Sequence, residues 1–230
     1  MLESSASTTS SPDVEVIVLA GGDTVDGAIR HLLPDHATVI AADSGLALAP
    51  ILGLTVDLVV GDMDSVDPDQ LAAARAAGTA VDQYPPDKDR TDLAIALDAA
   101  MARSPARITV VGGHGGRLDH LLANTALFAS TSYADTRIVA RMGHATLTVV
   151  RGGRSATGLC GAPGDVVSLL AVHGDAYGVT TDGLRFALDG HDLAAGSSRG
   201  VSNEFTGDRA TVALHDGVLL AVQPGDPTQG

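Results

Sequence analysis

The chain lacks the residues that mark several classes of protein. It has one cysteine, Cys160, and no tryptophan among its 230 residues. One cysteine excludes an internal disulfide framework or a cysteine-rich zinc site, and its glycine-flanked setting predicts a loop. No apolar run approaches the roughly 18 residues that cross a bilayer, and the first dozen residues lack the features of a secretion signal. We therefore expect a cytoplasmic protein that binds no membrane, with residues 1–12 disordered.

Positive charge is also scarce. There are 14 basic residues against 28 acidic ones, for a net charge of −14, and Lys88 is the sole lysine. So acidic a surface repels phosphate backbones, and we do not expect nucleic acid as a partner. Hydrophobic residues at 45% supply a globular core. Nearly all the acids are Asp, the residue of caps, turns and magnesium sites.

Strand and helix patterns alternate as far as about residue 141. Short apolar runs at 14–20, 38–42, 57–60 and 107–111 predict strands. Helices are predicted at 26–33, 44–52, 68–77, 90–102 and 117–129. This alternation indicates an α/β fold, a Rossmann-like parallel sheet with helices on both faces.

After about residue 141 the pattern becomes that of an all-β region. Strands are predicted at 145–150, 165–172, 210–214 and 218–222, with turn signals between them and no long helix. Asp216-Gly217, between the last two runs, predicts a hairpin. We therefore predict an α/β domain at 13–143 and a sandwich-like all-β domain at 144–230.

Carboxylates and glycines follow the predicted parallel strands, where ligands bind in such sheets. The set comprises Gly21, Gly22, Asp43, Asp62, Asp64, Gly112 and Gly113. Asp62 and Asp64, at i and i+2 in extended backbone, would face one cation, and oxygen ligands suit magnesium. For Asp43 alone, a helix cap is an equally good explanation.

Two further segments carry candidate phosphate contacts. Lys88 lies among three acids directly before a predicted helix, where Lys88 and Arg90 suit a phosphate, and Asp89 and Asp92 could reach a metal. Surface ion pairs at a capped helix start are the simpler alternative.

The second segment is the glycine loop at 112–116 and the predicted helix after it. Arg117, His120 and Asn124 form a polar stripe on that helix, although His120 could be a hydrogen-bonded core residue. The face roughly opposite carries Leu118, Leu122 and Ala129.

Familiar motifs fail on inspection. Asp87 precedes Lys88 where a Walker A loop needs glycine, and Leu118 stands where the dinucleotide fingerprint needs its third glycine. The Gly-x-Ser-x-Gly match at 196–200 is not followed by a predicted helix, which argues against a serine hydrolase.

Four strings resemble the thiamine pyrophosphokinase family, in that family's order. They are Ala-Asp-Ser-Gly at 42–45, the run 53–65 ending Gly-Asp-Met-Asp-Ser, Lys-Asp-Arg-Thr-Asp at 88–92 and Gly-Gly-Arg-Leu-Asp-His at 115–120. Segments 167–170, 178–184 and 201–204 resemble its thiamine-binding domain. The resemblance covers about residues 14–222 and departs from the family pattern at Ser44, Met63 and His114.

The resemblance implies transfer of a pyrophosphoryl group from ATP to the hydroxyl of thiamine, releasing AMP. Magnesium would be held by Asp62, Asp64 and Asp92, with Asp43 helping to position metal or nucleotide, and with Lys88 and Arg117 stabilising phosphate charge. The residues implied to bind nucleotide are Gly21, Gly22, Ser44, Gly45, Lys88, Thr91, Gly115, Gly116, Arg117, His120 and Asn124. The residues implied to bind thiamine are Asp119, Ser202 and Asn203.

The resemblance also implies a homodimer whose active sites combine the α/β domain of one chain with the β domain of the other. Two alternatives remain at this point. One is a pyrophosphokinase that acts on a pterin alcohol, and the other is a non-catalytic sensor that binds nucleotide or thiamine.

Overall fold

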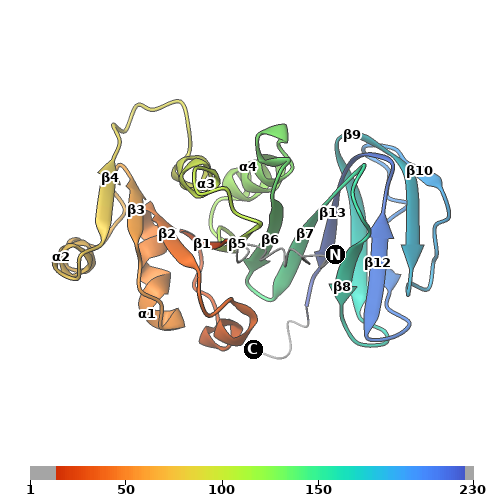
Figure 1. The fold of residues 1–230 in the computed structure, drawn as a ribbon, viewed down its shortest axis with the longest axis horizontal. Coiled ribbons are helices and arrows are strands. Elements are labelled where there is room, and N and C mark those ends of the chain that lie inside the picture. Colours follow the sequence, from red (N-terminus) through yellow and green to blue (C-terminus); the bar gives the residue numbers. More distant parts are fainter. Residues whose placement is uncertain (1–13, 226–230) are drawn as a thin grey trace, which may run out of the picture.

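The computed structural model describes residues 14–225, so the predicted disordered segment 1–12 lies outside the described residues. Six strands form a parallel sheet in the order β4-β3-β2-β1-β5-β6 (Figure 1). They are β1 (Glu15–Ala20), β2 (Thr38–Ala42), β3 (Leu58–Gly61), β4 (Ala80–Gln83), β5 (Arg107–Gly112) and β6 (Arg137–Met142). The strand order reverses between β1 and β5. That reversal is the switch point at which open α/β sheets bind ligands.

Helices cover both faces of this sheet, as predicted. The helical elements are η1 (Gly27–Leu32), η2 (Asp43–Ala47), α1 (Leu48–Leu52), α2 (Pro68–Ala76), α3 (Asp92–Met101), α4 (Leu118–Phe128) and η3 (Thr131–Tyr133). In β1, Val16 and Val18 face the core under α3 and α4, while Ile17 and Leu19 face the core of α1. Because both faces are covered at β1, β2 and β3, those strands need continuous apolar runs.

The second region is antiparallel. β6 turns at Gly143-His144 into β7 (Ala145–Arg151), and β7 is followed in the sheet by β13 (Asp216–Gln223) and β9 (Val166–Asp182). Past the middle of β9, the chain pairs instead with β10 (His191–Leu193) and β12 (Arg209–Ala213), and β12 pairs with β8 (Thr157–Cys160).

The first half of β9 also pairs with the short β11 (Asn203–Glu204). A separate hydrophobic core, which includes Leu169, Val179, Val212 and Leu219, fills the space between these layers. The result is the predicted α/β part followed by a sandwich-like β part. The exact boundary at residues 143 and 144 stays a prediction.

The hairpin prediction at Asp216-Gly217 is wrong. β12 and β13 do not pair with each other. β12 pairs with β8 and the end of β9, whereas β13 pairs with β7 and the first half of β9. The backbone amide of His215 donates to the carbonyl of Tyr177, so this connection crosses between the two layers of the sandwich.

Other local expectations also need correction. Cys160 ends strand β8 instead of lying in a loop. Leu118 and Leu122 are 67% and 60% exposed, while Ala129 is buried, so these three do not share one face against the core. Within residues 14–225, no helix is long and apolar enough to cross a membrane.

Candidate active site

A pocket of about 610 Å³ opens at the carboxyl ends of β1, β2, β3 and β5, at the switch point of the sheet. It brings together most of the residues singled out in the sequence. Those in its lining are Gly21, Gly22, Asp43, Ser44, Asp62, Asp64, Lys88, Thr91, Asp92, Gly115, Gly116, Arg117, His120 and Asn124. Strand ends and helix starts far apart in the sequence therefore converge on one cavity.

Three carboxylates from different elements form the most concentrated charge in the pocket. Asp43 follows β2, Asp62 follows β3 and Asp92 begins α3, and each offers an oxygen within 4.8 Å of the others. Gly61 permits this approach, because a Cβ at that position would lie 3.0 Å from both the Asp43 Cβ and the Asp92 Oδ1. The backbone of Gly61, at φ 145°, is also one that side chains disfavour.

Asp43 is the most deeply placed of the three. It is 7% exposed, and its Oδ1 is buried with no hydrogen-bond partner among the described residues. Burial raises the pKa of Asp43, and the charges of Asp92 and Asp62 raise it further, against a backbone hydrogen bond from Ser44 that lowers it. The buried oxygen thus lacks a positive partner.

Lys88 bridges the other two carboxylates. Its Nζ lies 2.8 Å from Asp62 Oδ2 and 2.9 Å from Asp92 Oδ1, and its side chain is 11% exposed. The hydrogen bond from Lys88 is the main reason that the pKa of Asp62 lies below its ordinary value. Burial lowers the pKa of Lys88, but the two carboxylates outweigh that effect and raise it. One ammonium therefore balances only part of the negative charge.

Asp64 lies in the pocket but outside the three-carboxylate group. Its Oδ1 accepts the hydroxyl of Ser65, and its backbone amide donates to Asp62 Oδ1 at 3.2 Å. Met63 between them has φ 66°, so the backbone is a turn and not the extended segment that the i, i+2 argument assumed. A ligand role for Asp64 stays a prediction.

The start of α3 is held by its own contacts. The hydroxyl of Thr91 accepts the backbone amide of Ala94 and caps the helix. Arg90 lines the pocket, but its guanidinium pairs with Asp98 and lies near the Tyr133 hydroxyl. Arg90 therefore anchors this segment, while Lys88 is the cation that faces the carboxylates.

The glycine loop after β5 lies directly against the loop after β1. The amide of Asp23 donates to the carbonyl of His114 at 2.8 Å, and a Cβ on Gly115 would lie 1.9 Å from the Asp23 carboxyl carbon. The buried amide of Asn124 donates to the carbonyl of Gly113 at 3.0 Å. Asn124 thus holds the loop in place. Asp23 was missed in the sequence, although its position directly after Gly21-Gly22 was a usable signal.

Arg117 precedes α4 and faces solvent at the pocket rim. It forms an ion pair with Asp119 at 2.6 Å, and both side chains are largely exposed. This hydrogen-bonded pair lowers the pKa of Asp119 to about 2. An exposed pair of this kind is weakly held, so a phosphate in the pocket can compete for the guanidinium.

Four of the site residues that the resemblance implies are not in the pocket lining, namely Gly45, Asp119, Ser202 and Asn203, and neither are the sequence candidates Asp89 and Gly112. Gly45 packs against the backbone of Leu19. Asn203 is 5% exposed, and its side-chain amide exchanges hydrogen bonds with the backbone of Phe186. Ser202 beside it is exposed. Their predicted contact with thiamine stays a prediction.

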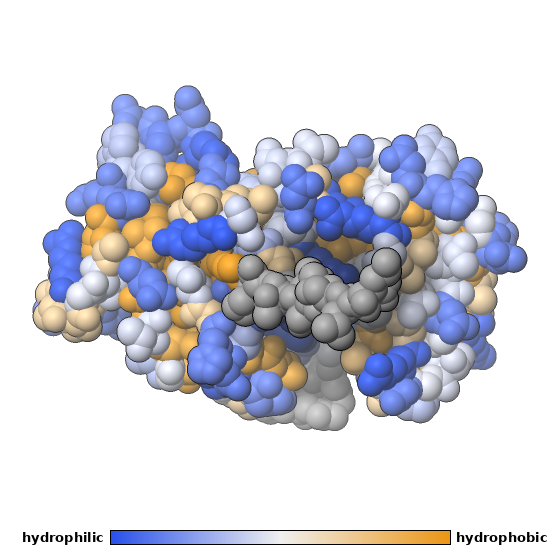
Figure 2. Space-filling model, in the orientation of Figure 1, coloured by the Kyte–Doolittle hydropathy of each residue, from blue (hydrophilic) through white to orange (hydrophobic). Residues whose placement is uncertain are grey.

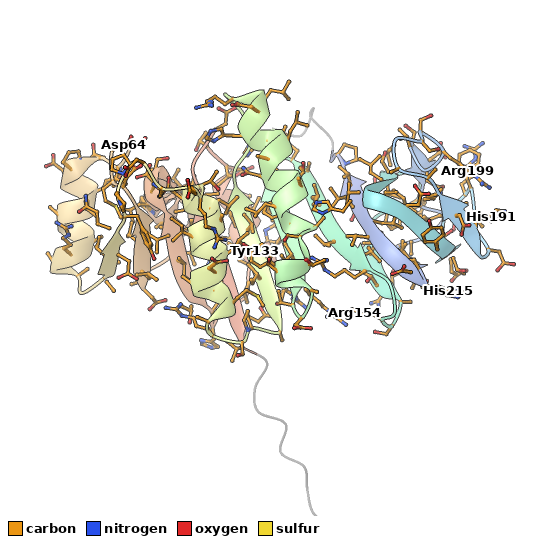
Figure 3. All side chains as sticks on the ribbon, turned by 90° about the horizontal axis from the view of Figure 1, so that it is seen from above. Asp64, Tyr133, Arg154, His191, Arg199 and His215 are labelled. Atoms are coloured by element: carbon orange, nitrogen blue, oxygen red, sulfur yellow. The ribbon has the colours of Figure 1, made fainter. Side chains whose placement is uncertain are left out.

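Up to residue 225, the β region therefore contributes no residue to the pocket of its own chain. The described lining ends at Asn124. Figure 3 shows Asp64 toward one end of the molecule and Arg199, three residues before Ser202, toward the other.

The carboxylate group fits a hard divalent cation. Magnesium takes oxygen ligands and binds through one or two protein carboxylates together with substrate phosphates. Asp43, Asp62 and Asp92 offer oxygens that are close together, and the unpartnered Asp43 oxygen is the kind that a cation would satisfy.

Comparisons with known proteins identify a family for both parts of the chain. Residues 29–140 match the family model "Thiamin pyrophosphokinase, catalytic domain", and residues 158–219 match "Thiamin pyrophosphokinase, vitamin B1 binding domain". The thiamine pyrophosphokinase of Bacillus subtilis is 25% identical over 221 residues, which cover 88% of this chain and 97% of that protein.

Solved structures share the whole architecture. The thiamine pyrophosphokinase structure from Bacillus subtilis aligns with a TM-score of 0.81 at 24% identity, covering 92% of this chain and 99% of that one. The thiamin pyrophosphokinase from Geobacillus thermodenitrificans aligns with a TM-score of 0.78 at 26% identity, covering 94% and 99%. The enzyme from Candida albicans, at 13% identity, still reaches a TM-score of 0.74 over 92% and 89%.

Proposed function

The chain belongs to the thiamine pyrophosphokinase family, and from this we propose that it transfers the pyrophosphoryl group of ATP to thiamine. The hydroxyl oxygen of thiamine attacks the β-phosphorus and the bond to the α-phosphate oxygen breaks. AMP leaves with the electron pair, and the hydroxyl proton is released. The observation that carries the proposal is the convergence of Asp43, Asp62, Asp92 and Lys88 at the switch point.

Phosphoryl-type transfer depends mainly on positioning and on charge stabilisation. Asp43, Asp62 and Asp92 would hold magnesium, whose charge would offset that of the triphosphate. Lys88 is already desolvated, which strengthens its attraction to phosphate oxygens. Arg117 at the rim would give up its ion pair with Asp119 and bind a phosphate oxygen instead.

The glycine loop places backbone beside the nucleotide. Gly115 and Gly116 have no side chain to block close approach, and both have positive φ. Asn124 fixes the loop from α4, and His120 and Ser44 contribute further polar groups to the lining.

We propose further that the active site is completed by a second copy of the chain. Thiamine needs walls on several sides, and the predicted thiamine residue Ser202 lies outside its own chain's pocket. The exposed Leu118 and Leu122 on α4 next to the pocket, and the exposed Phe186 and Val201 near Ser202, are apolar surfaces that such a dimer would bury. We also propose that the protein is cytoplasmic.

Product analysis tests the reaction directly. Purified protein is incubated with ATP, magnesium and thiamine, and the nucleotide product is identified. AMP together with thiamine pyrophosphate supports the proposal, whereas ADP with thiamine monophosphate contradicts it. AMP formed only with a pterin alcohol would reassign the acceptor while keeping the chemistry.

A further inference from the structure

A second cavity lies on the face of the sheet opposite α3 and α4. It is a groove of about 620 Å³ whose floor is β5, β6 and β7, flanked by the end of η1 on one side and β8 on the other. In Figure 1 this face of β5–β7 carries no helix among the described residues. The groove shares no lining residue with the candidate active site.

The strand register sets a polar floor in this groove. Ile138 and Ala140 of β6 face the core beneath α3 and α4, so Arg137, Val139 and Arg141 point to the opposite face. On β7 the same alternation gives Thr146 and Thr148 to the groove. The register therefore places two guanidinium groups and two hydroxyls on the groove side of neighbouring strands, where each can donate to a ligand.

Positive charge in the groove exceeds negative charge, in a chain whose net charge is −14. Arg107 and Arg137 are register neighbours on adjacent strands, which places like charges side by side. Glu15 pairs with Arg107 at 3.2 Å. Within residues 14–225, no carboxylate forms an ion pair with Arg137 or Arg141.

Of Arg137 and Arg141, Arg141 gives the stronger argument for a bound ligand. Its guanidinium donates to the hydroxyl of Thr146, and its Nε is buried with no hydrogen-bond partner among the described residues. Burial lowers the pKa of Arg141. The Nε of Arg151 is likewise buried without a partner, but the terminal nitrogens of Arg151 donate to three carbonyls at the end of α4, those of Phe128, Ala129 and Ser130. Within the described residues, the guanidinium of Arg141 has one hydrogen bond, to Thr146, so more of its donors remain for a ligand.

We propose that this groove binds a small anion that carries a phosphate group, held by Arg137 and Arg141 with the hydroxyls of Thr146 and Thr148. Guanidinium forks and hydroxyl donors match the oxygens of a phosphate, and the groove is large enough for a nucleoside monophosphate as well as for the inorganic ion. This site lies apart from the catalytic pocket and does not depend on the proposed reaction.

The single cysteine provides a local probe, because Cys160 is exposed and lines the groove. A trifluoromethyl label on Cys160 reports the groove by ¹⁹F NMR. We expect inorganic phosphate, added at constant ionic strength, to move the resonance in a saturable way. A parallel titration with AMP distinguishes a phosphate ester from the free ion. The ligand with the lower dissociation constant is the form that the groove selects.

Two variants and a matched control complete the test. Arg137→Gln and Arg141→Gln should each weaken phosphate binding about tenfold or more, the scale of a lost charge-assisted hydrogen bond. Arg137 is exposed, so its variant keeps the test valid even if Arg141→Gln fails to fold. Arg199→Gln removes the same charge at an exposed position away from the groove and should bind normally. A resonance that phosphate does not move, equal affinity for acetate, or unchanged binding in Arg137→Gln would overturn the proposal.

Discussion

The two cavities of this molecule carry opposite imbalances of charge. In the candidate active-site pocket, Asp43, Asp62 and Asp92 lie close to one lysine, Lys88. In the groove behind the sheet, Arg137 and Arg141 have no carboxylate partner within residues 14–225, and one carboxylate pairs with Arg107. A charge that folding leaves partly buried and unbalanced is costly. The excess of carboxylates in the pocket therefore points to a bound cation, which would in turn bind phosphates. The excess of arginines in the groove points to a bound anion.

The cavities also differ in how the backbone builds them. Most of the residues that line the pocket lie in turns or loops that follow strand ends, and in these segments Asp43 and Met63 have positive φ. The residues that form the floor of the groove lie in regular strands, where register alone sets which side chains face outward. Positive φ in residues other than glycine is rare and gathers at functional sites. The contrast is consistent with catalysis in the pocket and simple binding in the groove.

The largest expected effect comes from the pocket. Asp62→Asn removes a charge that is proposed to hold magnesium, and turnover should fall at least about a hundredfold with the fold intact. Steady-state rates in saturating magnesium measure this effect. Asp69→Asn, on the exposed side of α2, is the matched control. Near-normal turnover of Asp62→Asn would remove the carboxylate group from the mechanism.

Lys88→Met should lower kcat/KM for ATP about tenfold or more, because it removes a charge aimed at phosphate while keeping most of the side chain's volume. Thiamine affinity, measured by calorimetry, should change little, and Lys88→Arg should restore part of the ATP use. If affinity for thiamine falls equally, Lys88 has a structural role instead.

A mixed dimer tests whether sites are shared between chains. Asp62→Asn damages the α/β half of a site, and Ser202→Trp blocks the proposed thiamine half. Random exchange of equal amounts makes half the dimers mixed, and each of these would contain one intact site. Activity should then recover to about a quarter of wild type. Background activity, with mixed dimers verified by mass spectrometry, would mean that each chain builds its own site.

A smaller effect is expected on stability. Asp43→Asn removes a buried charge whose pKa is raised by burial and by its acidic neighbours. The metal-free variant should therefore melt a few degrees higher at neutral pH, the scale of about 1 kcal/mol in a chain of this length. Asn also tolerates the positive φ of this position.

The pH dependence of that gain has a definite sign. A raised folded-state pKa means that ionised Asp43 destabilises the fold at high pH. The gain should be complete above the raised pKa and should disappear as the pH falls toward the ordinary Asp range. Thermal melts without metal, from about pH 4 to about pH 8, check this. A gain that grows toward low pH would contradict it.

The sequence was enough to place most of the pocket, because parallel strands end at one edge and the residues after them must meet there. It could not reveal that Asp43 joins Asp62 and Asp92 in place of Asp64. That choice depends on the turn at Met63 and on the approach allowed by Gly61, which are tertiary features.

Some strands were harder to predict. Two strands of the parallel sheet, β4 and β6, were missed: β4 is mostly exposed, and β6 carries Arg137 and Arg141 among its apolar residues. In the β region, Asp216 and Gly217 form the start of β13 at a register irregularity and not a hairpin turn, and tertiary packing places β12 and β13 in different layers. Asn203 was singled out by resemblance, and its hydrogen bonds to Phe186 are invisible without the fold.

One crossed titration tests the central contrast most directly. Wild type, Asp43→Asn and Arg137→Gln, each labelled at Cys160, are titrated with magnesium by calorimetry and with phosphate by ¹⁹F NMR. The account predicts that Asp43→Asn weakens magnesium binding and leaves the phosphate shift unchanged. Arg137→Gln should do the reverse. If either variant lost both responses, or neither, the two cavities would not be the separate, oppositely charged sites described above.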